Sequence, residues 1–311
     1  MSSFENAVAL LSYAFVQRAF LVGALIAVIS SLLSVFIVLK SISLIGDGLA
    51  HTAFGGLAFA YYAGVAPLLT AGVVVVLASM GITKVTRSTK IQSDAAVAVF
   101  LTLGLATGVL FLGLGKGYGV DLESLLFGSI LLSSWNQIGL TAVVLVATVA
   151  AVFVSFQKLV LTVFNARQAE AAGIRTWAFD YLIAALTGVA VIVSIPITGV
   201  LLIAALLVLP GLTSIQVARS FRQTVALAPV FGLASVLVGI FLSLLIDVAP
   251  GSTIVLTGLA ILVGAVVAKR VRAWAEQPPN TPTDPTPTSG PGARDRGSEL
   301  RGTSRAGTSI D

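Results

Sequence analysis

Cysteine is absent from the 311-residue chain, and histidine occurs only once, at His51. A chain without thiols cannot form disulfides, thiolate metal sites or a cysteine nucleophile. A single histidine also excludes any site that needs several imidazoles from one chain. Both absences argue against a metal-dependent intramembrane enzyme, which would need further ligands and an activated nucleophile or water.

Charged residues are scarce as well, at 10% of the chain against about 25% in an ordinary soluble domain. Apolar residues make up 57% of the sequence, and the mean hydropathy is +1.03. Apolar runs recur between Phe20 and Ala268, and several can cross a hydrocarbon core of about 30 Å. The sequence therefore predicts an all-α, polytopic membrane bundle.

Basic residues orient the predicted spans, because cytoplasmic loops carry an excess of Lys and Arg. Nine crossings agree with every basic loop, with the amino terminus outside and the carboxyl terminus inside. The count falls to eight if the first segment does not span. A further apolar stretch, Leu122–Leu132, is too short to span and suggests an interfacial or re-entrant helix. The nine predicted spans are Phe20–Leu39, Ile42–Tyr61, Pro67–Thr83, Ala95–Leu112, Ile138–Phe156, Ala178–Ile195, Gly199–Ala218, Val225–Ile246 and Ile254–Ala268.

Composition divides the chain into a membrane domain, residues 1–274, and a tail, residues 275–311. Six of the eleven prolines lie in the tail, among Thr, Ser, Gly and alternating charges. Such a segment buries too little apolar surface to offset its ordering entropy, so we expect a disordered cytoplasmic tail. Within the membrane domain, proline and glycine pairs interrupt several spans, as at Pro210 and Gly211. Broken helices favour a transporter, with ordinary kinks at packing interfaces as the alternative.

The most informative polar pair is Asp47 and His51, in the segment Leu44–His51. Their i,i+4 spacing places both on one face of a helix, with Cβ atoms about 5–6 Å apart. A carboxylate and a neutral imidazole both suit a divalent cation, and ionisable groups inside a span usually line a pathway. The alternative is an Asp–His pair that satisfies itself and fixes helix packing.

Two further acids lie near predicted span ends. Asp247 precedes a Pro-Gly turn, where it is either a ligand at the outer mouth of a pathway or a polar helix-end residue. Asp94 begins a helix, where we expect it to cap free backbone N–H groups. The glycines around Lys116 do not form a phosphate-binding loop, because Leu110 and Gly117 occupy positions that need Gly and Ser or Thr. Any ATP hydrolysis must therefore occur on another chain.

Residues Phe164–Arg175 predict a short cytoplasmic helix, capped at Asn165 and stopped at Gly173. Its alanines allow another surface to approach closely. A solvated connector is the alternative.

Five segments, in the same order, resemble the manganese/zinc/iron permeases of ABC importers. The family's Gly-Asp…Ser-His signature matches Gly46 to His51, with Ala50 in place of serine, and Ser129 replaces an aspartate in Leu126–Leu132. The other matching segments are Asp94–Val99, Gly199–Ser214 and Asp247–Leu256.

The resemblance implies a type II ABC importer-like permease in the plasma membrane, carrying a divalent metal ion (Mn, Zn or Fe) into the cytoplasm. Asp47, His51 and Asp247 would line the metal pathway. Phe164, Ala169 and Gly173 would belong to a coupling helix that docks on the ATPase. The implied partners are cytoplasmic ABC ATPase subunits that bind the ATP, an extracytoplasmic metal-binding protein and a second copy of the chain. Membrane lipid surrounds the bundle, and neither a nucleic acid nor a covalently bound cofactor is expected. An iron-chelate or vitamin ABC permease and an ATP-independent secondary metal transporter remain alternatives.

Overall fold

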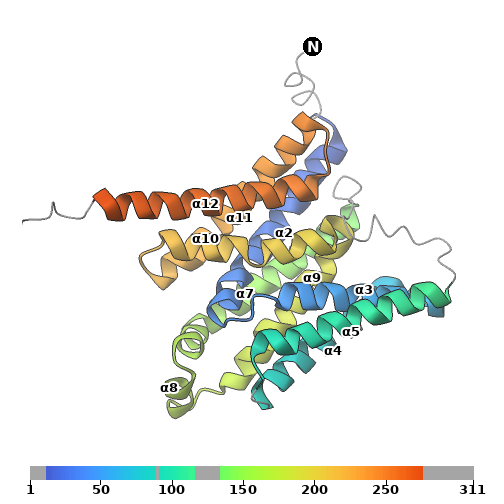
Figure 1. Cartoon of the computed structure of the whole chain (residues 1–311), viewed down its shortest axis with the longest axis horizontal. Coiled ribbons are helices and arrows are strands. Elements are labelled where there is room, and N and C mark those ends of the chain that lie inside the picture. The colour runs from blue at the N-terminus through green and yellow to red at the C-terminus, as the bar shows by residue number, and fades with distance from the viewer. Residues whose placement is uncertain (1–11, 89–90, 116–133, 276–311) are drawn as a thin grey trace, which may run out of the picture.

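A computed structural model describes residues 12–88, 91–115 and 134–275 of the chain. Every regular element in these ranges is a helix (Figure 1). The tail and the Leu122–Leu132 segment lie outside the described residues, so their predicted conformations stay predictions. The helices are α2 (Ala14–Leu39), α3 (Ile45–Ala63), α4 (Pro67–Ser88), α5 (Ser93–Leu114), α7 (Trp135–Phe164), α8 (Ala166–Ala171), α9 (Thr176–Leu206), α10 (Leu209–Val217), α11 (Phe221–Ile246) and α12 (Pro250–Ala275).

The all-α membrane bundle is confirmed. Seven described helices are long and apolar enough to cross a bilayer, and Leu202–Val217 forms a shorter apolar helix. This gives seven to eight candidate spans, so the finer count of eight or nine stays a prediction. Helix α3 has the length of a span but falls outside the seven, because its sequence is less apolar.

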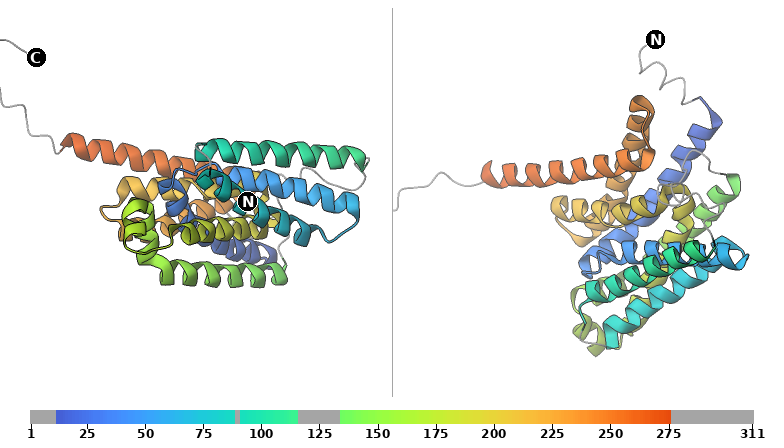
Figure 2. Two further views of the ribbon diagram at one scale, coloured as in Figure 1. Left: turned by 90° about the horizontal axis from the view of Figure 1, so that it is seen from below. Right: turned by 45° about the vertical axis from the view of Figure 1, so that its right-hand side comes forward.

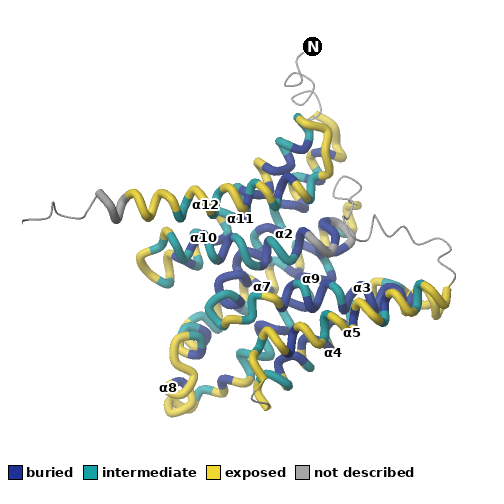
Figure 3. The backbone as a smooth tube through the Cα atoms, viewed as in Figure 1, coloured by how far each residue is buried: buried dark blue, intermediate teal, exposed yellow. Residues whose placement is uncertain are grey.

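Helix α2 runs through the middle of the bundle and packs against α7, α9, α10 and α11 (Figure 3). Its sequence is apolar on all sides, which is typical of a fully buried helix. Small residues allow its neighbours to approach closely: Ser31 lies against Gly232 of α11, so that a Cβ added to Gly232 would lie 2.8 Å from the Ser31 Cβ. The first predicted span is therefore present and longer than expected, since α2 begins at Ala14.

The backbone between α9 and α10 is broken twice. At Gly199 the φ and ψ angles are 74° and 169°, which kinks α9 at this residue. A second break follows at Val208, just before α10. Ser34 of α2 satisfies backbone groups at this second break. Its hydroxyl accepts a hydrogen bond from the Gly211 N–H at 2.8 Å and donates one to the Val208 carbonyl at 3.2 Å. A broken helix persists in a membrane only where such groups satisfy the freed backbone.

We expect Ser34→Ala to destabilise the protein, because the buried Gly211 N–H and Val208 carbonyl both lose this partner. The cost should be about 1–3 kcal/mol and should appear as a lower thermal unfolding midpoint in detergent. Ser30→Ala is the matched control. Ser30 is equally buried on α2, but its hydroxyl has no hydrogen-bond partner in the structure. Equal midpoints for the two variants would contradict the assigned role of Ser34.

Candidate metal site

Asp47 and His51 lie in the first two turns of α3. Asp47 is in the first turn, where the free N–H groups of the helix start favour a negative charge. Both side chains are half-buried. The structure describes no hydrogen bond between them and no ion pair for either. The alternative of a self-satisfied Asp–His pair therefore finds no support in the described contacts.

The glycines beside Asp47 define the direction in which its side chain projects. A Cβ on Gly46 would lie 3.0 Å from Leu207, near the α9–α10 break, and one on Gly48 would lie 2.5 Å from Val97 of α5. Successive helical residues are rotated by about 100°, so Asp47 points between these two contacts. His51, one turn later, lies on the same face. A carboxylate and an imidazole thus share one partly open face of α3.

Helix α5 packs closely against α3 at the level of His51. A Cβ added to Gly104 would lie only 2.6 Å from the His51 carbonyl oxygen and 2.6 Å from the Thr52 Cα. Gly104 and Gly108 form a Gly-x-x-x-Gly spacing on α5, a pattern that lets membrane helices approach closely. Thr52 adds a 3.3 Å hydrogen bond from its hydroxyl to the Phe100 carbonyl of α5.

Because backbone atoms line the space beside Gly104, we expect Gly104→Ala to push α5 away from α3 at the level of His51. Overpacking of this kind costs about 1–3 kcal/mol or more, so the thermal unfolding midpoint should fall. Gly113→Ala on the same helix is the control, because a Cβ there meets nothing within 4 Å. Thermal unfolding midpoints of the two variants in detergent would test the packing. A Gly104→Ala protein that matches Gly113→Ala would show that the contact is unimportant.

Asp247 does not join this pair. It ends α11 in the left-handed conformation, with φ 56° and ψ 50°, and is exposed. No three His, Cys, Asp or Glu residues of the described chain gather into a possible metal site. Asp247 thus has the geometry of a polar helix-end residue, and its place on the metal pathway stays a prediction. The prediction that Asp94 caps its helix is wrong. The N-cap of α5 is Gln92, which makes no side-chain cap hydrogen bond, and Asp94 lies in the first turn of the helix.

Helix α8 has the predicted start and stop. The Asn165 side chain accepts from the Gln168 N–H at 3.1 Å, and Gly173 ends the helix at a positive φ of 78°. Ala169 is fully buried, so it holds α8 against the bundle and presents no surface to another chain. Phe164 stacks edge-on against Phe221 of α11, with ring centroids 5.4 Å apart. Every residue of α8 except Ala169 is exposed, namely Ala166, Arg167, Gln168, Glu170 and Ala171.

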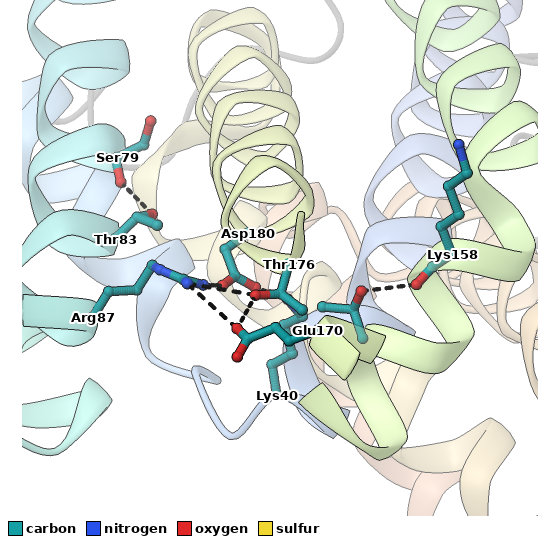
Figure 4. Close-up of polar contacts among 9 residues, drawn as sticks. Lys40, Ser79, Thr83, Arg87, Lys158, Glu170, Thr176 and Asp180 are labelled. Carbon is teal, nitrogen blue, oxygen red and sulfur yellow. Dashed lines mark hydrogen bonds and ion pairs between the residues drawn. The ribbon is translucent and has the colours of Figure 1, made fainter. Parts of the chain in front are cut away.

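An ion-pair cluster beside α8 was missed by the sequence reasoning, which used its basic members only for topology. Asp180 of α9 pairs with both Lys40, at the end of α2, and Arg87 of α4 (Figure 4). Glu170 of α8 lies 4.0 Å from Arg87 and accepts a 2.6 Å hydrogen bond from the Thr176 hydroxyl. One available signal was Asp180 itself, an acid near the start of a span on the side rich in Lys and Arg.

Residues 12–269 match the family model described as the ABC 3 transport family. The chain belongs to the ABC 3 transport family. It is thus the membrane permease subunit of an ABC transporter complex, which also contains an ATPase subunit, and is not itself the ATPase. These two expectations from the sequence are confirmed, and so is the expectation of a multi-pass membrane protein.

The sequences of related proteins align with most of the permease. It is 31% identical over 263 residues to the manganese import system permease protein ScaB of Streptococcus gordonii, matching 83% of this chain and 93% of that protein. It is 29% identical over 247 residues to the manganese transport system membrane protein MntC of Halalkalibacterium halodurans, matching 79% and 85%.

A solved structure agrees with these sequence matches. The structure of PsaBC from Streptococcus pneumoniae in complex with Fab superposes with a TM-score of 0.74 at 28% identity, covering 84% of this chain and 94% of that chain. The described fold of the permease is therefore similar to an experimentally observed one.

Proposed function

We propose that this permease subunit of a divalent-metal ABC importer passes its cargo along the face of α3 that carries Asp47 and His51. One observation supports this path most directly. Asp47 and His51 are half-buried, one turn apart, and have no described ion pair, on the helix that is less apolar than the seven candidate spans. Such groups cost several kcal/mol inside a membrane, and they usually line a pathway or bind a partner.

The donor set favours a first-row divalent metal as cargo. A carboxylate oxygen and an imidazole nitrogen suit Mn²⁺, Fe²⁺ and Zn²⁺, and the chain offers no thiolate that would select a softer ion. Two ligands from one chain replace only part of a metal ion's water shell. A homodimer would supply a second Asp47 and a second His51 to a shared central pathway.

The proposed assembly lies in the plasma membrane with the carboxyl terminus in the cytoplasm. The end of α7, α8 and the basic start of α11 then face the cytoplasm, as the positive-inside rule requires. An extracytoplasmic binding protein delivers the metal at the opposite end, near Asp247. Asp247 terminates α11 at this outer mouth, where its side chain is exposed on the single subunit.

Radiotracer uptake into proteoliposomes tests the proposal. The vesicles contain the permease, its ATPase and its binding protein, and uptake of Mn²⁺, Fe²⁺ and Zn²⁺ is compared with and without ATP. ATP-dependent accumulation of at least one metal is expected. Uptake that continues without the ATPase would favour the secondary transporter, and uptake of only a metal chelate would favour the iron-chelate permease.

Docking of the ATPase on α8 gives a separate prediction. The exposed face of α8 includes Arg167 and Ala171, so Arg167→Glu combined with Ala171→Trp should reverse a charge and add bulk where the ATPase approaches. Co-purification of the ATPase should then fall about tenfold or more, because buried hot-spot contacts are worth about 2 kcal/mol each. Arg270→Glu, an exposed cytoplasmic change on α12, is the control. Equal ATPase recovery from both variants would exclude α8 as the docking surface.

A further inference from the structure

A cavity of about 620 Å³ is lined by residues of α7, α2 and α11. Its wall is apolar, formed by Val149, Val152, Phe153 and Phe156 of α7 with Leu32 of α2 and Val225 of α11. Figure 2 shows α7 along one edge of the described bundle. Phe153 and Val154 are 82% and 83% exposed, which is the exposure of side chains that face lipid. The hollow therefore opens toward the bilayer.

Two cations line the same cavity at its cytoplasmic end. Lys158 lies six residues before the end of α7, about 9 Å from it along the helix axis. Arg222 is the second residue of α11, two positions after the Ser220 cap. Phe153 and Val149 lie deeper along α7, by about one and a half and two and a half turns from Lys158. Positive charge thus lies at headgroup depth, above an apolar wall at acyl-chain depth.

The position of Arg222 is fixed by its neighbour. The Phe221 ring contacts Phe36 of α2, Phe156 of α7 and Phe164 at the end of α7, with centroids 6.0, 5.7 and 5.4 Å away. Because Phe221 joins α11 to both other helices, the backbone of Arg222 is held at a set distance from Lys158. The two cations belong to one built site and not to independent mobile loops.

Neither cation has a described counter-ion. Of the acids near the cytoplasmic end, Asp180 pairs with Lys40 and Arg87, and Glu170 faces Arg87. The described ion pairs include neither Lys158 nor Arg222. Two positive charges without a described counter-ion, at the mouth of an apolar hollow, are complementary to an anion with a hydrocarbon tail. Basic pockets between membrane helices on the cytoplasmic side bind anionic lipid headgroups for this reason.

We propose that this cavity binds an anionic phospholipid of the cytoplasmic leaflet. Its phosphate lies between Lys158 and Arg222, and the Gln157 amide is a further donor at the rim. One acyl chain follows the apolar wall along Phe153 and Val149. The lipid bridges α7, which leads into α8, and α11, so it braces the segment on which the ATPase docks.

Native mass spectrometry of the assembled transporter tests the site. The complex is equilibrated with equal amounts of phosphatidylglycerol and phosphatidylcholine, and the retained lipids are counted. Wild type should retain phosphatidylglycerol preferentially, and Lys158→Gln combined with Arg222→Gln should reduce this preference at least fivefold. Lys269→Gln combined with Arg270→Gln is the control, because it removes two cations from the cytoplasmic end of α12, away from the cavity. Its lipid preference should equal that of wild type.

Three results would overturn the proposal. The first is an unchanged preference in the Lys158/Arg222 variant, and the second is an equal loss in the control variant, which would indicate general surface charge. The third is loss of the ATPase or of the second permease copy from the variant in lipid-free detergent, which would make this surface a protein interface. Thermal midpoints in phosphatidylcholine alone verify that the variant is folded. Added phosphatidylglycerol should raise the midpoint of wild type and leave that of the variant unchanged.

Discussion

Asp47→Asn is expected to reduce ATP-dependent metal uptake by about 10- to 100-fold or more, because even the outer-shell partners of metal ligands carry effects of that size. Asparagine has the size of aspartate but lacks the negative charge that stabilises a divalent cation. Asp47 has no described ion pair whose loss would unfold the protein. The thermal midpoint should therefore stay close to that of wild type while uptake falls.

His51→Ala should give a loss of the same order, and the double variant tests whether the two residues act on one ion. Residues that share a ligand are strongly non-additive, so the combined loss should be close to the larger single loss. Effects that multiply would instead indicate that Asp47 and His51 act at separate points of the pathway.

Asp94→Asn and Asp247→Asn are the matched controls, since both acids are exposed and both lie at helix ends. Asparagine tolerates the left-handed backbone at Asp247, so only the charge changes there. Both variants should keep uptake within about twofold of wild type, because exposed surface changes cost little. Normal uptake by Asp47→Asn, with uptake lost in Asp247→Asn, would move the site to the outer end of α11.

The sequence predicted which segments are helical, because apolar runs in a membrane must satisfy their backbone groups internally. It predicted the helix ends less well. The span expected at Ile138–Phe156 continues as α7 from Trp135 to Phe164. Gln157 and Lys158 extend it beyond the apolar run, since helical hydrogen bonding continues where polar side chains reach the interface. Apolarity marks the part of a helix within the hydrocarbon, not the whole helix.

The candidate site was predicted in part for a related reason. The spacing of Asp47 and His51 follows from helix geometry, which is local. The Ser34 bridge to Gly211 and the Lys40–Asp180 pair join residues 177 and 140 positions apart. Such contacts depend on how helices pack, and a single sequence contains no direct record of them. Proline and glycine indicated where the backbone breaks, while the serine that satisfies the break was identified only in the structure.

Asp180→Asn is the second change with a large expected effect. Asp180 faces both Lys40 and Arg87, so its neutralisation leaves two cations close together, with Glu170 as the remaining acid among the described ion pairs. The side chains are 22% exposed for Asp180, 13% for Lys40 and 34% for Arg87. Removing one partner of a fully buried pair costs about 3–5 kcal/mol, and partial exposure lowers this to about 2–3 kcal/mol. We expect the thermal midpoint to fall by about 5 °C or more.

Transport should suffer beyond this loss of stability. The cluster joins α8 and α9 to Lys40, and α3 begins only a few residues after Lys40. The cluster therefore lies between α8, the proposed docking helix, and the helix that carries Asp47. If α8 docks the ATPase as proposed, the amount of metal imported per ATP hydrolysed should fall in the Asp180→Asn complex, because the ion pairs that join α9 to Lys40 and Arg87 are lost. ATP hydrolysis and metal uptake measured in the same vesicles give this ratio.

Two further variants test whether the effect comes from the unbalanced charge and whether it is specific to Asp180. Lys40→Gln added to Asp180→Asn removes the excess cation, so it should restore much of the stability, giving a favourable coupling energy in a double-mutant cycle. Glu170→Gln should cost less than about 0.5 kcal/mol, because Glu170 is 56% exposed and lies 4.0 Å from Arg87. If Asp180→Asn were as stable and as tightly coupled as Glu170→Gln, the cluster would be ordinary surface charge. The link from α8 to α3 would then have to run through the apolar contacts of α9 with α3 and α4.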